Sequence, residues 1–115
     1  MIPRPGEIYL VETDAGKRPV VVVSREELNR GNWVVMALIT SAHFAVRSAL
    51  PHCMAFRAGE FGLTKDCVAQ AETLTYLAVS DLDLDAGIVG TLDETKLREL
   101  IRAVGNMMGS DCEPE

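Results

Sequence analysis

Lys17-Arg18-Pro19-Val20-Val21-Val22-Val23-Ser24 is the stretch of sequence that decides the fold. Its four consecutive valines are β-branched and stiff at χ1, which favours a strand over a helix. Because the apolar run is unbroken rather than alternating, we expect both faces of this strand to be covered. Proline suits the first position of a strand. Arg18 therefore lies at the open end of a rigid core strand, where a scaffold can hold a charge against a substrate.

The segments on either side of the valine stretch predict its neighbours in a sheet. Residues 6–11 predict an earlier strand, and residues 12–16 have the composition of a hairpin turn. Ser24 is placed to cap a short helical turn over residues 25–29. A second unbroken apolar run, residues 33–39, predicts another buried strand.

The second apolar run ends in Thr40 and Ser41, whose hydroxyls can donate hydrogen bonds to a phosphate or an oxyanion. If this strand is the antiparallel neighbour of the valine strand, the start of one adjoins the end of the other. Arg18 and Thr40 would then lie together at one end of the sheet. Arginine binds phosphate through a planar fork of donors, so the pair predicts an anion site.

The remainder of the chain predicts further short strands and one long helix. Strands are expected over residues 53–57 and 87–90, and a third strand is expected to begin at residue 66 and to end at residue 71 or 75. One helical turn is expected within residues 77–84, and a helix over residues 94–108 is capped by Asp93. The pattern indicates an α+β, mainly β fold: a small, SH3-like bent antiparallel sheet or barrel with a C-terminal helix. We expect a single domain over residues 1–109 and a polar C-terminal tail over residues 110–115.

Length, composition and charge limit the possible functions. The chain has 115 residues, 48% of them hydrophobic, and a net charge of −6. Residues 1–57 hold seven bases and five acids, whereas residues 58–115 hold four bases and twelve acids. This balance argues against general coating of nucleic acid but allows a local phosphate site in the first half. No apolar run is long enough for a membrane span, and no secretion signal is recognised at the N-terminus. The three cysteines are an odd number with irregular spacing, which we interpret as reduced thiols of a cytoplasmic protein.

The metal-ligating residue types do not form a familiar pattern. His52 is adjacent to Cys53, with His43 and Cys67 elsewhere, but zinc ligands are usually separated pairs. Cys53 and Cys67 both fall in apolar strand segments, which favour unreactive thiols. The sequence therefore predicts no metal site and no cysteine nucleophile.

Five segments in the same order resemble the MazF/PemK family of toxin ribonucleases, which has the CcdB/MazF fold. The matching segments are residues 4–11, 17–24, 37–41, 62–68 and 89–94. The stretch Lys17–Ser24 resembles the most recognisable motif of that family, and Ala37-Leu38-Ile39-Thr40-Ser41 resembles its second. The resemblance covers about residues 4–109. It implies a toxin of a toxin–antitoxin system that cleaves single-stranded mRNA in the cytoplasm without a metal or another cofactor.

The resemblance also implies roles for individual residues and partners. The catalytic arginine and threonine of the family fall on Arg18 and Thr40, and the acidic residue near the RNA falls on Glu72. The implied reaction is attack of a ribose 2′-OH on the adjacent phosphate, which leaves a 2′,3′-cyclic phosphate and a 5′-OH. Family members act as homodimers whose RNA groove is blocked by a cognate antitoxin. The residues expected to contact RNA are Lys17, Arg25, Ser41, Arg47, Glu72 and Thr73.

A protein on the same scaffold could instead have no enzymatic activity. It would then be a gyrase-directed poison, as CcdB-like members are, or an inactive paralogue that only binds an antitoxin. The presence of both Arg18 and Thr40 favours the enzyme, because a protein that only binds has no need for the pair.

Overall fold

The computed structural model describes residues 2–109, so the tail expected over residues 110–115, which includes Cys112, lies outside the described residues. In chain order the elements are β1 (Glu7–Thr13), β2 (Gly16–Val22), α1 (Glu26–Asn29), β3 (Trp33–Thr40), α2 (Phe44–Arg47), β4 (Cys53–Phe56), η1 (Glu60–Gly62), β5 (Cys67–Ala78), η2 (Val79–Asp81), β6 (Gly90–Thr91) and α3 (Glu94–Met107). None of the helices among these residues has the length and apolar character needed to cross a membrane.

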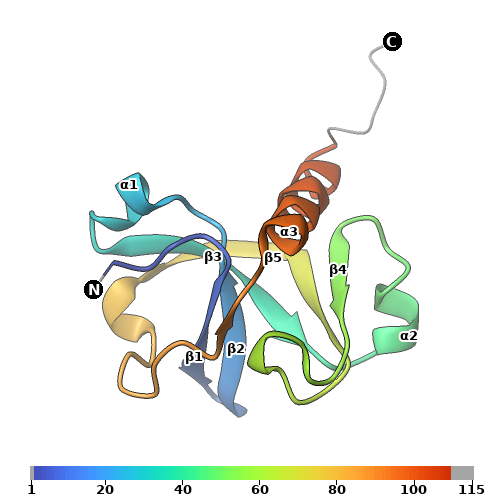
Figure 1. Cartoon of the computed structure of the whole chain (residues 1–115), viewed down its shortest axis with the longest axis horizontal. Helices are drawn as coiled ribbons and strands as arrows, with labels where there is room; N and C mark the ends of the chain where they lie inside the picture. Colours follow the sequence, from blue (N-terminus) through green and yellow to red (C-terminus); the bar gives the residue numbers. More distant parts are fainter. Residues whose placement is uncertain (1, 110–115) are drawn as a thin grey trace.

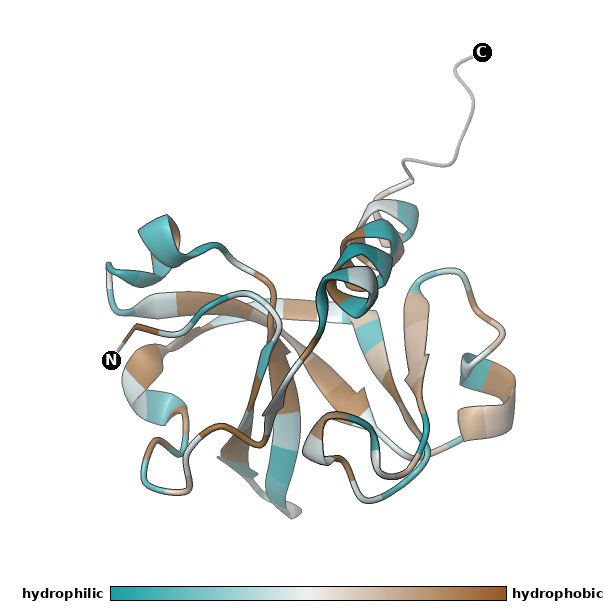
Figure 2. Ribbon diagram, viewed as in Figure 1, coloured by the Kyte–Doolittle hydropathy of each residue, from teal (hydrophilic) through white to brown (hydrophobic). Residues whose placement is uncertain are grey.

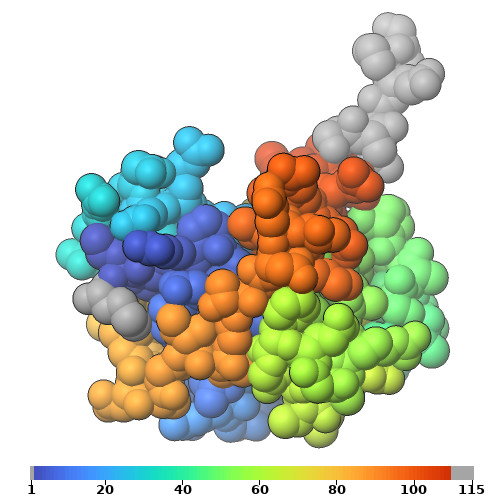
Figure 3. Space-filling view, viewed as in Figure 1, coloured from blue at the N-terminus to red at the C-terminus, as the bar shows by residue number. Residues whose placement is uncertain are grey.

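The strands form one curled antiparallel sheet in the order β4-β5-β3-β2-β1-β6, with α3 packed against it (Figure 1). This arrangement confirms the predicted fold class. Hydrophobic residues concentrate on the strands, whereas α1 is hydrophilic (Figure 2). In the space-filling view, α3 and the segment that leads into it cover the middle of one face (Figure 3).

The valine strand is buried on both faces, as its unbroken apolar run predicts. Val21 packs into a cluster with Leu100 of α3, whereas Val20 and Val22 pack into a second cluster around Tyr9. Val20, Val21 and Val22 are each 0% exposed. The core is therefore divided between the two sides of β2, which fixes the position of the residues at its ends.

Helix α3 begins where Asp93 predicts it. The side chain of Asp93 accepts a hydrogen bond of 2.8 Å from the backbone N–H of Lys96, which satisfies one of the free donors of the first turn. Leu100 and Ala103 lie on the buried side of the helix.

Three local predictions differ from the structure. Ser24 does not cap α1, which begins after Arg25 with no side-chain cap. Its hydroxyl instead donates to the buried Asn29 and accepts from Val35 N–H, because the backbone after β2 turns inward toward these groups. The elements expected from the sequence leave residues 42–51 without regular structure, but these residues contain the short helix α2. Strand β5 continues to Ala78, beyond both predicted ends.

The segment η1 lies directly on the start of β6. A Cβ atom on Gly90 would overlap the carbonyl oxygen of Phe61, and one on Gly62 would overlap the carbonyl oxygen of Val89. Only residues without a side chain allow the two backbones to approach this closely. The contact fixes the loop that runs from η1 into β5, which forms one wall of the candidate site.

Candidate functional site

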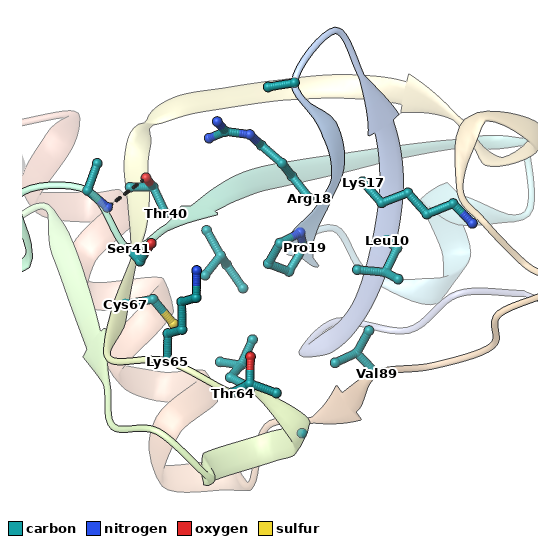
Figure 4. Close-up of a pocket in the computed structure, with 15 residues that line it drawn as sticks. Leu10, Lys17, Arg18, Pro19, Thr40, Ser41, Thr64, Lys65, Cys67 and Val89 are labelled. Carbon is teal, nitrogen blue, oxygen red and sulfur yellow. Dashed lines mark hydrogen bonds between the residues drawn. The ribbon is translucent and has the colours of Figure 1, made fainter.

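Arg18 and Thr40 lie at the same end of the sheet because of the register between β2 and β3. The two strands are antiparallel, with Val20 opposite Leu38. Continuing two residues along each strand brings Arg18 opposite Thr40, on the same face of the sheet. Both line one cavity of about 590 Å³, and Figure 4 shows the Arg18 guanidinium directed toward Thr40.

The Thr40 hydroxyl is held by the loop that follows β3. Its oxygen accepts a hydrogen bond of 3.2 Å from the backbone N–H of Ala42. Because the oxygen acts as acceptor in this contact, the hydroxyl proton remains available for donation to a ligand. Ser41 and Thr64 also line the cavity, so three hydroxyl-bearing residues surround it.

A second cation, Lys65, enters the cavity from the loop between η1 and β5. Figure 4 shows its ammonium group extending toward the space between Ser41 and Arg18. The sequence patterns described above assign no role to Lys65. The available signal was its place in the segment over residues 62–68, one of the five that resemble the toxin family.

Arg18 and Lys65 have no acidic partner among residues 2–109. Six other bases there form ion pairs with carboxylates: Arg4, Lys17, Arg30, Arg57, Lys96 and Arg98. The cavity therefore keeps two exposed, uncompensated positive charges in a protein whose net charge is −6. Such a site favours an anion, and the planar guanidinium favours phosphate in particular.

The rest of the cavity wall is largely apolar. Its hydrophobic lining consists of Leu10, Ala15, Pro19, Ile39, Ala42, Leu63 and Val89. A mixed wall of this kind can contact the flat faces of bases or the side chains of a peptide, while the two cations bind the charged groups.

The Cys67 thiol also lines the cavity but is not poised as a nucleophile. Burial raises the pKa of Cys67 to about 11, with smaller contributions in the same direction from Asp66 and Glu60. The thiolate is the reactive form, so a thiol with this pKa is nearly all protonated at pH 7.

Lys17 lines the cavity, but its side chain extends away from Thr40 (Figure 4). Its ammonium group donates to a carboxylate oxygen of Asp83, in the segment between η2 and β6. The structure therefore does not bring the charge of Lys17 to the Arg18–Thr40 pair. The lysine instead joins the β1–β2 hairpin to a distant loop.

The two other predicted RNA-binding arginines have different positions. Arg25 precedes α1 and lines a separate shallow hollow near Arg4. Arg47, at the end of α2, donates a hydrogen bond of 3.1 Å to the carbonyl oxygen of Ala42. Arg47 therefore supports the loop that positions Thr40.

Glu72 and Thr73 lie in an irregular part of β5 rather than in the cavity wall. Pairing with β3 changes register there: Leu38 is opposite Gln70, but Met36 is opposite Thr75. The Thr73 hydroxyl donates to the Gln70 carbonyl oxygen at 2.7 Å and accepts from Leu38 N–H at 2.9 Å. The side chain thus replaces a backbone partner within a β-bulge, a feature that often re-aims side chains near functional sites.

Glu72 lies on the same sheet face as Thr40. Gln70 is opposite Leu38, two residues before Thr40 on β3, and its side chain donates to a Glu72 carboxylate oxygen at 2.8 Å. Glu72 is four positions beyond Val68, the β5 partner of Thr40, which corresponds to about 13 Å along a regular strand. Glu72 and the Arg18–Thr40 pair therefore occupy two separate parts of one face.

The sequence matches the family described as PemK-like, MazF-like toxin of type II toxin-antitoxin system over residues 4–108. Similar solved structures include an endoribonuclease in complex with its cognate antitoxin from a Mycobacterial species, with 21% identity, a TM-score of 0.76, and 93% of this chain and 95% of that chain covered. Mycobacterium tuberculosis toxin MazF-mt6 has 23% identity and a TM-score of 0.74, covering 90% of this chain and 96% of that one.

A MazE-MazF structure from Deinococcus radiodurans has 17% identity and a TM-score of 0.73, with 95% of this chain and 97% of that chain covered. No sequence among the curated proteins matches the chain. At these identities the solved structures support the fold, and the match over residues 4–108 supports the family.

Proposed function

This chain belongs to the family of PemK-like, MazF-like toxins of type II toxin–antitoxin systems, and on that premise we propose that it is an endoribonuclease that cleaves single-stranded RNA. One observation carries the proposal: the Arg18 guanidinium, free of any acidic partner among residues 2–109, is directed toward the Thr40 hydroxyl in one open cavity. A cation and a hydroxyl donor in this arrangement suit a phosphodiester.

The proposed step is attack by a ribose 2′-oxygen on the adjacent phosphorus. A bond forms between the 2′-oxygen and phosphorus, and the bond from phosphorus to the 5′-oxygen breaks. The 2′-hydroxyl loses its proton to solvent and the departing 5′-oxygen gains one, so the products are a 2′,3′-cyclic phosphate and a 5′-OH. Negative charge increases on the phosphate oxygens as the new bond forms.

Arg18 and Thr40 have complementary roles in this step. Arg18 offsets charge on the phosphate oxygens, and Thr40 donates a hydrogen bond to one of them. Arginine stays protonated in proteins and is a poor base, so we assign it electrostatic stabilisation rather than proton abstraction, and the leaving 5′-oxygen takes its proton from solvent. Lys65 supplies a second positive charge for the same or a neighbouring phosphate.

We further propose that a cognate antitoxin blocks this cavity and that the toxin acts as a homodimer. Two of the similar structures contain an antitoxin, either a cognate antitoxin or MazE. The cavity here combines two free cations with an apolar wall, which suits a peptide segment with acidic and hydrophobic side chains. Such a segment would compete directly with RNA.

The test is cleavage of a long single-stranded RNA in EDTA by pure protein, beside matched variants. Thr40→Val and Arg18→Ala should each lower kcat by about 100- to 1,000-fold, the usual effect of removing one transition-state donor. Thr40→Ser keeps the hydroxyl and should retain most activity. Arg102→Ala is the control for loss of a cation, because Arg102 lies on α3 and lines a different hollow.

The ends of the products give an independent check of the chemistry. Polynucleotide kinase should label the new 5′ ends without prior phosphatase treatment, and the 3′ ends should carry the cyclic phosphate. If the folded parent cuts no RNA, the chain is a binding protein of the same family, such as a gyrase-directed poison. Equal cleavage by the parent, Arg18→Ala and Thr40→Val would assign the activity to a contaminant.

A further inference from the structure

Three side chains with metal-ligating atoms meet at the β4–β5 edge of the sheet. Cys53 is the first residue of β4, His52 directly precedes it, and Glu72 lies on β5 (Figure 1). One ligand atom from each lies within 4.8 Å of the others. The His52 Nε2 atom is 3.5 Å from a Glu72 carboxylate oxygen, and the Cys53 sulfur is 3.9 Å from the same oxygen.

These separations are close to those required by a tetrahedral zinc ion. Zinc binds nitrogen and oxygen at about 2.0–2.2 Å and sulfur at about 2.3 Å, so ligand atoms lie roughly 3.3–3.6 Å apart around it. The histidine–carboxylate distance already has this value, and the sulfur–carboxylate distance exceeds it by a few tenths of an ångström. The imidazole nitrogen and the sulfur lie within 4.8 Å of each other, so binding requires side-chain rotations that bring these two atoms closer together.

Backbone pairing holds the three residues in place. Ala71 N–H donates to the His52 carbonyl oxygen at 3.0 Å, and Cys53 is directly opposite Gln70 in the antiparallel ladder. The Gln70 amide also donates to the Glu72 carboxylate at 2.8 Å. A hydrogen bond to a ligating carboxylate is the outer contact that orients ligands in natural metal sites.

The site is accessible to an ion. The side chains of His52 and Glu72 are 32% and 39% exposed, whereas Cys53 is 8% exposed and forms the inner wall. The exposed histidine and glutamate side chains leave a path for an ion to enter, and the buried sulfur is shielded from water.

We propose that His52, Cys53 and Glu72 form a binding site for Zn²⁺ or a divalent cation of the same class, with water as the fourth ligand. The imidazole, thiolate and carboxylate are all established zinc ligands, and three protein ligands with one open position are a known zinc arrangement. The sequence alone predicts no metal site, and of the four histidines and cysteines considered there only His52 and Cys53 belong to this group. The proposal does not depend on RNA cleavage.

The test uses untagged, EDTA-treated protein, since a histidine tag would itself bind the ion. Titration with Co²⁺ should give one equivalent of bound metal with a thiolate charge-transfer absorption band, and Zn²⁺ should displace it. Cys53→Ser should remove this band and weaken zinc binding by at least about 100-fold, and Glu72→Gln should weaken it by about 10- to 100-fold. Cys67→Ser, Cys112→Ser and His43→Gln are the matched controls and should bind as the parent does.

A second measurement on the parent avoids any effect of the substitutions on folding. Zinc should slow alkylation of Cys53, identified by peptide mass, by at least about tenfold, and EDTA should reverse the protection. Rapid alkylation in the presence of zinc, a folded Cys53→Ser protein that binds zinc as the parent does, or several weak sites insensitive to all substitutions would each overturn the proposal.

Discussion

The Thr73 hydroxyl holds the bulge in β5, so its removal should destabilise the fold although the side chain is small. Its oxygen accepts from Leu38 N–H and donates to the Gln70 carbonyl. Thr73→Val replaces the hydroxyl by a methyl group of similar size. The substitution leaves a partly buried N–H without an acceptor and a carbonyl without a donor, while the shape of the side chain is kept.

The expected loss can be worked out from these two contacts. An unpaired, partly buried N–H costs about 1–3 kcal/mol, and a lost hydrogen bond to a carbonyl costs about 1 kcal/mol. The higher strand propensity of valine offsets part of this, at most about 1 kcal/mol. The net loss is therefore about 2 kcal/mol, which corresponds to a fall in Tm of about 8 °C for a domain of this length.

Urea unfolding followed by circular dichroism measures the effect. Thr73→Val should lower the midpoint by about 1 M at unchanged m-value. Thr73→Ser, which keeps the hydroxyl, should lose less than about 1 kcal/mol. A Thr73→Val protein within about 0.5 kcal/mol of the parent, or a serine variant as unstable as the valine variant, would refute the role assigned to the hydroxyl.

Three further outcomes follow from the contacts described above. Gly90→Ala should unfold the domain or lower its Tm by more than 10 °C, roughly 2–3 kcal/mol, whereas Gly31→Ala, with ordinary space around it, should stay close to the parent in thermal melts. In RNA-binding titrations, Lys65→Ala should reduce the salt dependence of the affinity by about one counterion. Lys17→Ala should lower the affinity for RNA no more than Asp83→Asn does, because Lys17 is paired with Asp83. A larger loss of affinity for Lys17→Ala would mean that Lys17 contacts RNA directly. Lys17 lowers the pKa of Asp83 in the folded protein. The stability difference between the parent and Asp83→Asn should therefore be complete above pH 3.8, the ordinary value, and should disappear as the pH falls through the lowered folded-state pKa. A difference that persists in stronger acid would contradict this pairing.

The proximity of Arg18 and Thr40 could be predicted because it depends on two strand patterns that each occupy a short stretch of sequence. The valine run and the apolar run that ends at Thr40 each identify a buried strand from composition alone. Antiparallel pairing then brings the start of one to the end of the other. The observed register, with Val20 opposite Leu38, confirms that step.

Lys65 could not be placed by the same reasoning. Its position depends on the backbone contact between η1 and β6, two segments separated by nearly thirty residues in the chain. No periodicity in the sequence reports such an approach. The glycines at positions 62 and 90 are compatible with it, but glycine also occurs in many ordinary turns.

The β-bulge in β5 is the reason why the positions of the Glu72 and Thr73 side chains could not be predicted. Regular alternation assigns side chains to faces only while the register is constant, and the register changes between Gln70 and Thr75. The side-chain contacts of Thr73 that hold the bulge involve β3, which lies far away in sequence. The approach of His52, Cys53 and Glu72 likewise requires the β4–β5 pairing and could not be read from adjacent residues.

The charge distribution explains how an acidic protein can present an anion site. The acids outnumber the bases, yet most bases in residues 2–109 already face carboxylates in surface ion pairs. Such pairs add little stability, and five bases of the same residues have no carboxylate partner there. Arg18 and Lys65 are two of these, and both line one cavity. If the proposed cleavage of RNA is correct, binding involves few phosphate contacts, and affinity should fall less steeply with salt than for a protein that coats nucleic acid.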